Sequence, residues 1–224
     1  MSSGSRSPLV VTIDGPAASG KSSTSKMVAE ALGLRHLDSG MIYRCVTAAR
    51  LRRGDPPDKW TEASVLDAAR HVSVAPGATS FEPRLDGVDC EAEIRGEAVT
   101  GTVSLVAKMP QVRSWVNALV RATAAAHEIV VDGRDMGTAV FPEARLKIWL
   151  VALPAERARR RILQRTGRAP AAGELEAETA ELEARDQKDR VQTQPAADAI
   201  WIDTTGITQA EQVERIVALA RERR

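Results

Sequence analysis

The sequence predicts an α/β protein built on a doubly wound parallel sheet with helices on both faces. Three observations carry this prediction: short apolar runs recur along the chain, segments with helical periodicity separate them, and a glycine-rich turn follows the first run. The runs have the length and composition of buried strands, and they lie at residues 9–13, 129–132, 146–151 and 199–202.

The first strand leads into a phosphate-binding loop, because residues 15–22 fit the pattern G-x-x-x-x-G-K-S/T without a mismatch. Its glycines let backbone N–H groups turn toward phosphate oxygens, and the next helix adds its positive end. Lys21 is predicted to reach the outer phosphates, and the Ser22 hydroxyl to hold Mg²⁺. An ordinary glycine-containing loop is the alternative, but the strand, turn and helix here are the context that the pattern requires. The predicted triphosphate contacts are Gly15, Pro16, Ala17, Ala18, Ser19, Gly20, Lys21, Ser22 and Ser23.

Two helices are expected after the loop. One covers residues 22–32 and ends at Gly33. The Asp-Ser-Gly sequence at residues 38–40 favours a turn, so the second helix is expected over residues 43–51. Tyr43 is the only tyrosine in the chain, and its spacing alone fits a core aromatic as well as a site residue.

Beyond the second helix the pattern of the chain changes. Residues 54–57 break the chain, and residues 60–70 predict a short amphipathic helix. Alternating side chains on both sides of the Asp86-Gly87 turn then predict a small antiparallel hairpin unit. Because this unit lies between helices, we expect a subdomain rather than part of the main sheet.

The second half of the chain returns to strands and helices. Pro110 is favourable at the first position of a helix, and Arg113 lies beside the apolar stripe of that helix. The next strand ends in Asp132, which a parallel sheet would place at the same carboxyl edge as the phosphate loop. Thr208 and Glu211 form a capping box that begins the last helix.

Arginines gather between the third and fourth predicted strands. A run of charges is usually a solvated helix face, but some of these arginines are expected to face nucleotide phosphates, with Arg157 and Arg161 as the predicted contacts. Residues 174–190 are strongly helical, and Arg185 and Asp189 lie one turn apart on this helix. An ion pair on the helix surface is the alternative to a site role for these two residues.

Composition disfavours several kinds of protein. The chain holds 31 Lys+Arg against 30 Asp+Glu, so no basic field argues for a nucleic-acid partner. Cys45 and Cys90 are too few for a disulfide scaffold and are expected to be free thiols, although a single bridge stays open. Residues 1–7 lack the apolar core of a signal peptide, and no run of 18 apolar residues predicts a membrane span. We therefore expect a cytoplasmic protein, with a monomer as the default.

Several motifs occur in a characteristic order from Val10 almost to the end of the chain. After the phosphate loop come D-S-G-M-I-Y-R at 38–44, S-L-V-A-K-M-P-Q-V-R at 104–113, D-G-R-D-M-G-T at 132–138, R-D-Q-K-D at 185–189 and D-T-T-G at 203–206. Together they resemble the bacterial cytidylate kinases, the CMP and dCMP kinases among the nucleoside monophosphate (NMP) kinases of the P-loop NTPase fold. The motifs at 38–44 and 132–138 separate this family from shikimate, adenylate and thymidylate kinases.

The resemblance implies one kinase domain over residues 8–224 that transfers a phosphoryl group from ATP, with Mg²⁺, to CMP or dCMP. It further implies an NMP-binding insert and a helical lid. The implied boundaries are a core of residues 8–42, 104–153 and 192–224, an NMP-binding region of 43–103 with a three-stranded β insert at about 71–99, and a lid of 154–191.

The resemblance also implies roles for individual residues. The implied acceptor contacts are Ser39, Tyr43, Arg44, Ser104, Arg113, Arg134, Asp135, Arg185 and Asp189. Of these, Arg134 and Asp135 look like the readers of cytosine, and Asp189 would lie near the sugar hydroxyls. The implied catalytic residues are Lys21, Asp132, Arg134 and Arg185.

The chain departs from the family pattern in the last third. Gln192 stands where a second arginine is frequent after Asp189, and the segment that follows is shorter, so Arg190 is an alternative for that role. In the phosphate loop, Ala18 stands where a third glycine is common.

The chemistry that follows needs no general base, because an acceptor phosphate oxygen is already anionic at neutral pH. Asp135 can accept a hydrogen bond from the 4-amino group of cytosine, which favours cytosine over uracil. A structural ion pair between Asp135 and Arg134 is the alternative. Rival functions are a UMP/CMP or dTMP kinase and a regulatory nucleotide switch, although the sequence lacks the guanine-reading N-K-x-D motif.

Overall fold

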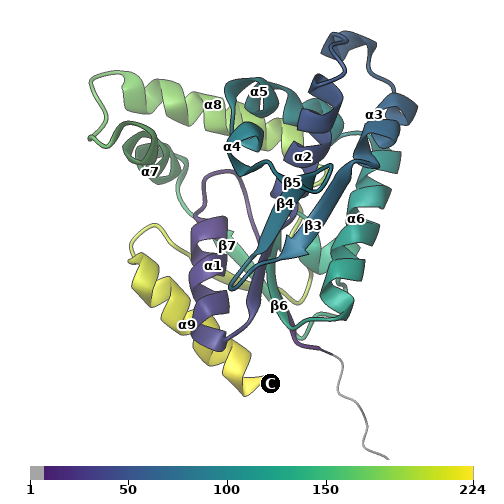
Figure 1. Cartoon of the computed structure of the whole chain (residues 1–224). Helices are drawn as coiled ribbons and strands as arrows, with labels where there is room; N and C mark the ends of the chain where they lie inside the picture. The colour runs from purple at the N-terminus through teal and green to yellow at the C-terminus, as the bar shows by residue number, and fades with distance from the viewer. Residues whose placement is uncertain (1–7, 224) are drawn as a thin grey trace, which may run out of the picture.

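The computed structural model describes residues 8–223 (Figure 1). The expectation about a signal peptide concerns residues 1–7 and lies outside them. The main sheet has five parallel strands in the order β2-β6-β1-β7-β8, which confirms the doubly wound fold. Its strands are β1 (Val10–Asp14), β2 (Arg35–Asp38), β6 (Ile129–Gly133), β7 (Leu146–Val151) and β8 (Ile200–Asp203).

Helices cover both faces of this sheet (Figure 1). On one face, apolar side chains of β1 and β7 pack against α1 and α9, and on the other, β6 packs against α2 and α6. Strand β1 is buried because it lies at the centre of the sheet, between β6 and β7. The helices are α1 (Lys21–Leu32), α2 (Ser39–Leu51), α6 (Pro110–Ala125) and α9 (Gln209–Glu222).

The edge of the sheet differs from the sequence prediction. Strand β2 was missed, because its four residues include arginine, histidine and aspartate and it becomes a strand only by pairing with β6. The predicted start of the second helix at Tyr43 is also wrong. Helix α2 begins at Ser39, since the Asp38 side chain accepts a hydrogen bond from the Met41 N–H at 3.2 Å and caps the helix.

The antiparallel insert forms as predicted around its turn. Asp86 and Gly87 have φ angles of 52° and 79°, which the tight hairpin turn requires. The strands occupy less of the expected range of about 71–99, because helices replace them after Asp89. The region contains η1 (Pro57–Lys59), α3 (Glu62–Ala69), β3 (Val72–Pro76), β4 (Phe81–Leu85), β5 (Val88–Asp89), α4 (Glu91–Ile94) and α5 (Glu97–Val106).

Hydrogen bonds and packing join the insert to the rest of the molecule. The N–H of His36 on β2 donates to the carbonyl of Thr79 at 2.9 Å, so the β3–β4 loop extends the edge of the main sheet. Cys45 and Cys90 are buried free thiols, as expected, with sulfur atoms 3.7 Å apart.

A helical hairpin completes the fold. Helices α7 (Pro154–Thr166) and α8 (Glu174–Asp189) pack on each other and lie to one side of the sheet (Figure 1). Leu182 of α8 and Ala158 of α7 are buried against Ala17 of the phosphate loop. The helical hairpin therefore rests directly on the loop.

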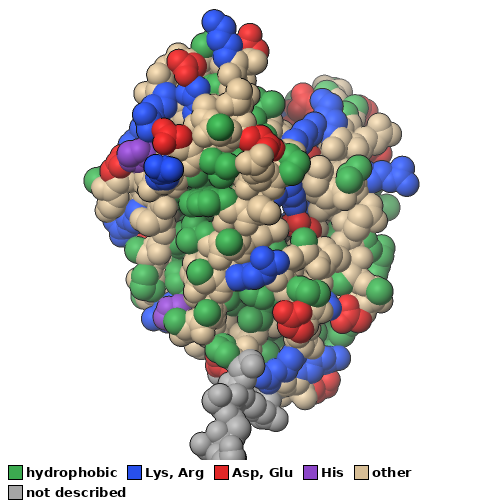
Figure 2. Space-filling view, turned by 90° about the vertical axis from the view of Figure 1, so that its right-hand side faces the viewer, with side chains coloured by type: hydrophobic (Ala, Val, Ile, Leu, Met, Phe, Trp, Pro, Cys, Tyr) green, Lys and Arg blue, Asp and Glu red, His purple; other side chains and the backbone are tan. Residues whose placement is uncertain are grey.

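The surface shows no segregation of charge on the face seen in Figure 2. Cationic, anionic and apolar side chains are interspersed there, in keeping with the formal net charge of +1. Among residues 8–223, no helix is long and apolar enough to cross a membrane.

Candidate active site

The phosphate loop connects the end of β1 to the start of α1. A Cβ atom on Gly15 would lie 2.2 Å from the carbonyl oxygen of Leu150 on neighbouring β7, so the loop can leave the sheet here only at glycine. Gly20 has a φ of 89° at the start of α1. Ala18, which stands where the family commonly has glycine, also adopts a left-handed conformation, with φ 57°. The loop therefore takes a glycine-like path without its third glycine.

Lys21 is held inside the loop. Its ammonium donates to the Pro16 carbonyl at 2.6 Å and lies 3.4 Å from the hydroxyl of Ser19. Burial, together with the charge of Arg134, lowers the pKa of Lys21 to about 7. A bound phosphate would favour the charged form and raise that pKa again.

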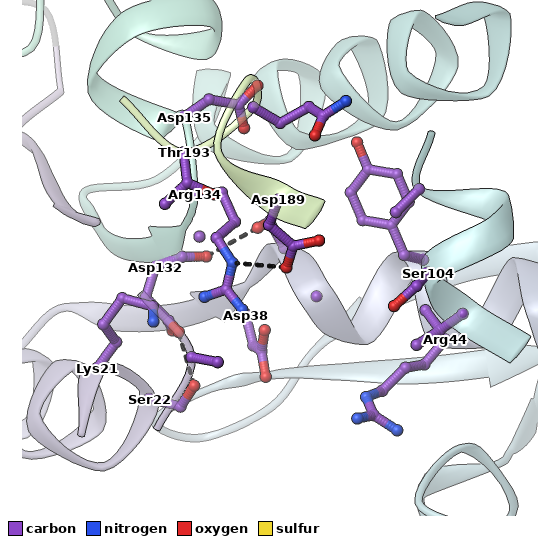
Figure 3. Close-up of a pocket in the computed structure, with 18 of the residues that line it drawn as sticks. Lys21, Ser22, Asp38, Arg44, Ser104, Asp132, Arg134, Asp135, Asp189 and Thr193 are labelled. Atoms are coloured by element: carbon purple, nitrogen blue, oxygen red, sulfur yellow. Dashed lines mark hydrogen bonds and ion pairs between the residues drawn. The ribbon is translucent and has the colours of Figure 1, made fainter. Parts of the chain in front are cut away.

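Asp132 meets the phosphate loop from the neighbouring strand. Strand β6 pairs with β1 and ends beside it, as predicted, and Asp132 is 2% exposed. Its Oδ2 accepts a hydrogen bond from Ser22 Oγ at 2.6 Å (Figure 3). Mg²⁺ prefers hard oxygen ligands such as hydroxyl and carboxylate groups, which it binds together with substrate phosphates. Ser22 and Asp132 therefore fit this ion. Among residues 8–223, no cluster of three or more His, Cys, Asp or Glu side chains could hold a metal by itself.

A cavity of about 330 Å³ lies beside the loop, within the range of small-molecule sites. It brings together predicted residues from the loop, from helices α2, α5 and α6, from the end of β6 and from α8 (Figure 3). The predicted residues that line it are Ala17, Ala18, Lys21, Ser22, Ser39, Tyr43, Arg44, Ser104, Arg113, Asp132, Arg134, Asp135, Arg185 and Asp189.

One end of this cavity combines an aromatic ring with an ion pair. Arg113 of α6 pairs with Asp135 and lies over the ring of Tyr43, 5.9 Å from its centroid. Burial raises the pKa of Asp135, against the opposing effect of Arg113. The buried Tyr43 hydroxyl has no hydrogen-bond partner among residues 8–223, and burial raises the pKa of Tyr43 to about 12, so the hydroxyl stays protonated. Asp135 thus pairs with Arg113 rather than with Arg134, the partner considered from the sequence.

Arg134 joins the phosphate loop to α8. Its guanidinium donates to the Gly15 carbonyl at 3.0 Å and lies 3.8 Å from Asp189 Oδ2 (Figure 3). Arg185 lies 3.8 Å from the same carboxylate oxygen. Two guanidinium groups therefore share Asp189 at the mouth of the loop, and both would be attracted to a phosphate there.

Helix α2 supplies two further predicted residues, Arg44 and Ser39. Arg44 donates to the Ile94 carbonyl at 3.1 Å and to Thr100 Oγ1 at 3.0 Å, which fixes it between α4 and α5. Ser39 donates to the backbone carbonyl of Asp132 at 2.8 Å, which ties the start of α2 to the end of β6.

A second cavity, of about 840 Å³, lies on the other side of the loop. It shares Ala18, Lys21, Ser22 and Arg95 with the first cavity, so the two meet at these residues. Arg159, Arg160 and residues 205–209 also line it. The predicted triphosphate contacts that line it are Ala18, Ser19, Gly20, Lys21, Ser22, Ser23 and Arg161.

Three predicted triphosphate contacts line neither cavity. Gly15 and Pro16 present their carbonyls to Arg134 and Lys21. Arg157 is 3% exposed, donates to the Ala17 carbonyl at 2.8 Å and pairs with Asp186 at 2.7 Å. Arg157 therefore connects the helical hairpin to the loop.

Two carboxylates at the carboxyl edge of the sheet were not selected from the sequence, and of these Asp38 lines the first cavity. Asp14 accepts from the N–H groups of Met136 and Gly137, and burial raises its pKa to about 6. Burial and neighbouring Asp132 raise the pKa of Asp38 to about 6 as well. Both carboxylates follow parallel strands, and the rule that selected Asp132 could have found them.

The short segment after α8 also reaches the first cavity. Gln192 and Thr193 line it, whereas Arg190, the alternative considered for the missing arginine, does not. No feature of the sequence alone distinguished Thr193.

The chain is similar to known proteins over nearly its whole length. Residues 11–222 match the family described as cytidylate kinase. A cytidylate kinase of Mycobacterium avium is 42% identical over 222 residues, which cover 96% of each protein. A cytidylate kinase of Thermus thermophilus is 41% identical over 210 residues, covering 93% of this chain and 97% of the relative.

Solved structures support the architecture. An uncharacterized protein from Eubacterium ventriosum superimposes with a TM-score of 0.55 at 10% identity, covering 96% of this chain and 99% of that protein. At this identity the likeness shows the fold alone.

The fold and the site thus define a P-loop kinase, with a phosphate loop at the carboxyl edge of a parallel sheet and a cavity on each side of the loop. The match to the family model and to these relatives shows that the chain belongs to the cytidylate kinase family. It is accordingly a phosphotransferase that acts on a nucleoside monophosphate.

Proposed function

We propose that this protein transfers the γ-phosphoryl group of ATP to CMP and dCMP, with release of ADP. The observation that carries the proposal is that Lys21 and Ser22 line both cavities, so a donor in one and an acceptor in the other would meet at these residues. Several relatives that are about 40% identical are named cytidylate kinases, which supports cytosine nucleotides as acceptors.

The charges around this meeting point suit a transfer between two polyanions. Lys21 would hold the outer phosphates of the donor, while Arg134 and Arg185 would neutralise the acceptor phosphate and the phosphoryl group in transit. Because the acceptor oxygen is already anionic, positioning and charge stabilisation supply the catalysis, and no side chain must remove a proton.

Ser22 is the residue that would hold Mg²⁺, with the carboxylate of Asp132 beside it. Bound Mg²⁺ would neutralise negative charge on the phosphate oxygens and help to keep donor and acceptor in line. Arg161 lines the second cavity, where we propose that the donor binds, and the proposed lid of residues 154–191 would exclude water from the donor on closing.

Selectivity for cytosine is proposed to come from Asp135 and Arg113. The Asp135 carboxylate can accept from the 4-amino group of cytosine, whereas uracil presents an acceptor there, which would face the carboxylate without a hydrogen bond. The buried Tyr43 hydroxyl, which has no hydrogen-bond partner among residues 8–223, lies in the same part of the cavity and offers one more hydrogen-bond donor.

An acceptor screen tests the function. CMP, dCMP, UMP, AMP and dTMP are each supplied with Mg-ATP, and ADP release is measured. We expect the highest kcat/KM with CMP and dCMP. A higher value with UMP or dTMP would replace this proposal with the corresponding kinase, and ADP release without any acceptor would favour a nucleotide switch.

Asp135→Ala tests the reading of the base. We expect kcat/KM for CMP to fall and the preference for CMP over UMP to drop by about 10- to 100-fold, because the lost discrimination amounts to about 1–3 kcal/mol. Arg113→Lys is the companion variant. It keeps a cation near Tyr43 but loses the planar guanidinium group that pairs with the Asp135 carboxylate. An unchanged CMP/UMP ratio in Asp135→Ala would refute the assignment.

A further inference from the structure

His36 of β2 contacts Asp132 of β6 and the β3–β4 loop of the insert, and through Asp132 it is linked to Ser22 of α1. Its ring is 9% exposed, and Nε2 lies 2.5 Å from Oδ1 of Asp132. The other carboxylate oxygen of Asp132 accepts from Ser22 Oγ at 2.6 Å. The two oxygens of the buried Asp132 carboxylate thus have different partners. One contacts His36 of β2, and the other accepts from Ser22 of α1.

The ring can donate to Asp132 whether or not it is protonated. Burial disfavours the charged ring, but the hydrogen bond and the charge of Asp132 outweigh this effect and raise the pKa of His36. The charge of Asp38 acts in the same direction, and Lys26 opposes it. Both the imidazolium and the neutral ring with its proton on Nε2 donate to a carboxylate, so the contact does not depend on one charge state.

The backbone of His36 is fixed from both sides. On one side β2 pairs with β6, where His36 is in register with Val130. On the other side its N–H donates to the Thr79 carbonyl at 2.9 Å, and a bridge joins it to Ser80 of the insert. With its backbone held in this way, the ring has little freedom to leave the carboxylate.

We propose that His36 is a positioning residue for phosphoryl transfer, which holds the Asp132 carboxylate so that its second oxygen stays directed at Ser22. The proposal rests on the function inferred above, because Ser22 is the residue that would hold Mg²⁺. A carboxylate bound through one oxygen only could rotate away, and side chains that orient a group beside a metal commonly affect affinity or activity by about 10- to 100-fold. His36 also links the insert, through Thr79, to the residues at which donor and acceptor meet.

The test compares His36→Leu with His36→Gln. Leucine fills the volume without a donor, whereas the glutamine amide can donate to the same oxygen. We expect His36→Leu to lower kcat by about 10- to 100-fold, to raise the Mg²⁺ concentration needed for half-maximal rate, and to leave the KM for CMP within about twofold. His36→Gln should recover most of the lost kcat.

His127→Leu is the matched control. It makes the same substitution at a histidine that contacts Arg35, also on β2, without touching Asp132. We expect it to change the melting temperature at most. If His36→Leu lowers only the melting temperature and keeps kcat, or if His36→Gln fails to recover the rate while remaining folded, the positioning role is overturned.

A binding measurement separates this inference from the proposed function. A fluorescent ADP analogue is titrated with and without Mg²⁺, and we expect His36→Leu to reduce only the part of the affinity that Mg²⁺ adds. Asp132→Asn should abolish that difference, so His36→Leu in the Asp132→Asn background should have no further effect. This result would stand even if the acceptor screen showed an acceptor other than CMP. An equal loss of affinity with and without Mg²⁺ would contradict the inference.

Discussion

At the scale of single residues, the site contains ionisable side chains whose charged forms are disfavoured by burial. Lys21 is enclosed by its own loop, and its pKa is lowered to about 7 by burial and by Arg134. Asp14 and Asp38 lie near it with pKa values raised to about 6. The protein keeps these groups in place at a cost in stability, which is typical of sites that bind charged ligands.

Lys21→Met is predicted to abolish catalysis and to stabilise the protein without nucleotide. We expect kcat to fall by about 100- to 1,000-fold or more, because a main cation at the transferred phosphoryl group is lost. The unfolded state keeps the Lys21 proton up to about pH 10.5, whereas the folded state releases it near pH 7. The cost of burying this charge is therefore full below pH 7 and is relieved as the pH rises toward 10.5.

Calorimetry at several pH values checks this sign. Lys21→Met should melt above the wild type at pH 6.5, and the difference should shrink as the pH rises through 8 and 9. A melting temperature below that of the wild type at every pH would contradict the account of a strained lysine.

At the scale of elements, local signals decided helix ends better than strand edges. The Thr208–Glu211 capping box begins α9 as predicted. Asp38 was interpreted as part of a turn, yet it caps α2, because an Asp-Ser-Gly sequence suits a turn and a helix start equally well. Strand β2 has no local apolar signal and depends on its neighbour β6.

Thr61→Ala tests the local contribution of a cap away from the site. Thr61 and Ser64 form a capping box at the start of α3. We expect a loss of about 1 kcal/mol in the free energy of unfolding, or about 2–4 °C in melting temperature, with unchanged kcat and KM. Urea denaturation and steady-state kinetics measure the two effects. A change in KM for CMP would show that the helix reaches the acceptor site.

At the scale of the whole molecule, the helical hairpin packs on the phosphate loop around Ala17. Arg157 donates to the carbonyl of Ala17, the N–H of Ala17 lies 3.4 Å from Asp186, and the two side chains pair with each other. Ala158 and Leu182 pack around the same residue. Motion of the hairpin would therefore move Ala17 and alter the conformation of the loop that is proposed to hold ATP.

Arg157→Met and Asp186→Ala distinguish docking from direct phosphate binding. If the pair docks the hairpin, each variant should raise the KM for ATP by about tenfold, as expected for the loss of a charged hydrogen bond, and the double variant should do little more. If Arg157 instead binds ATP directly, only Arg157→Met should weaken it. Initial rates at varied ATP concentration with saturating CMP provide the comparison.

The sequence by itself determined the class of fold and the residues of the phosphate loop. Both are encoded locally: apolar runs mark buried strands, and a contiguous loop carries its donors on its own backbone. The resemblance of several motifs to those of the cytidylate kinases also selected residues that line the first cavity, among them Tyr43 and Asp189.

Only the tertiary structure decided which charges meet. Asp135 pairs with Arg113, Arg157 is enclosed by Asp186 and the loop, and His36 meets Asp132 from 96 residues away. These contacts depend on which strand lies beside which and on how deeply each side chain is buried. The order β2-β6-β1 sets that arrangement, and no local pattern of residues specifies it.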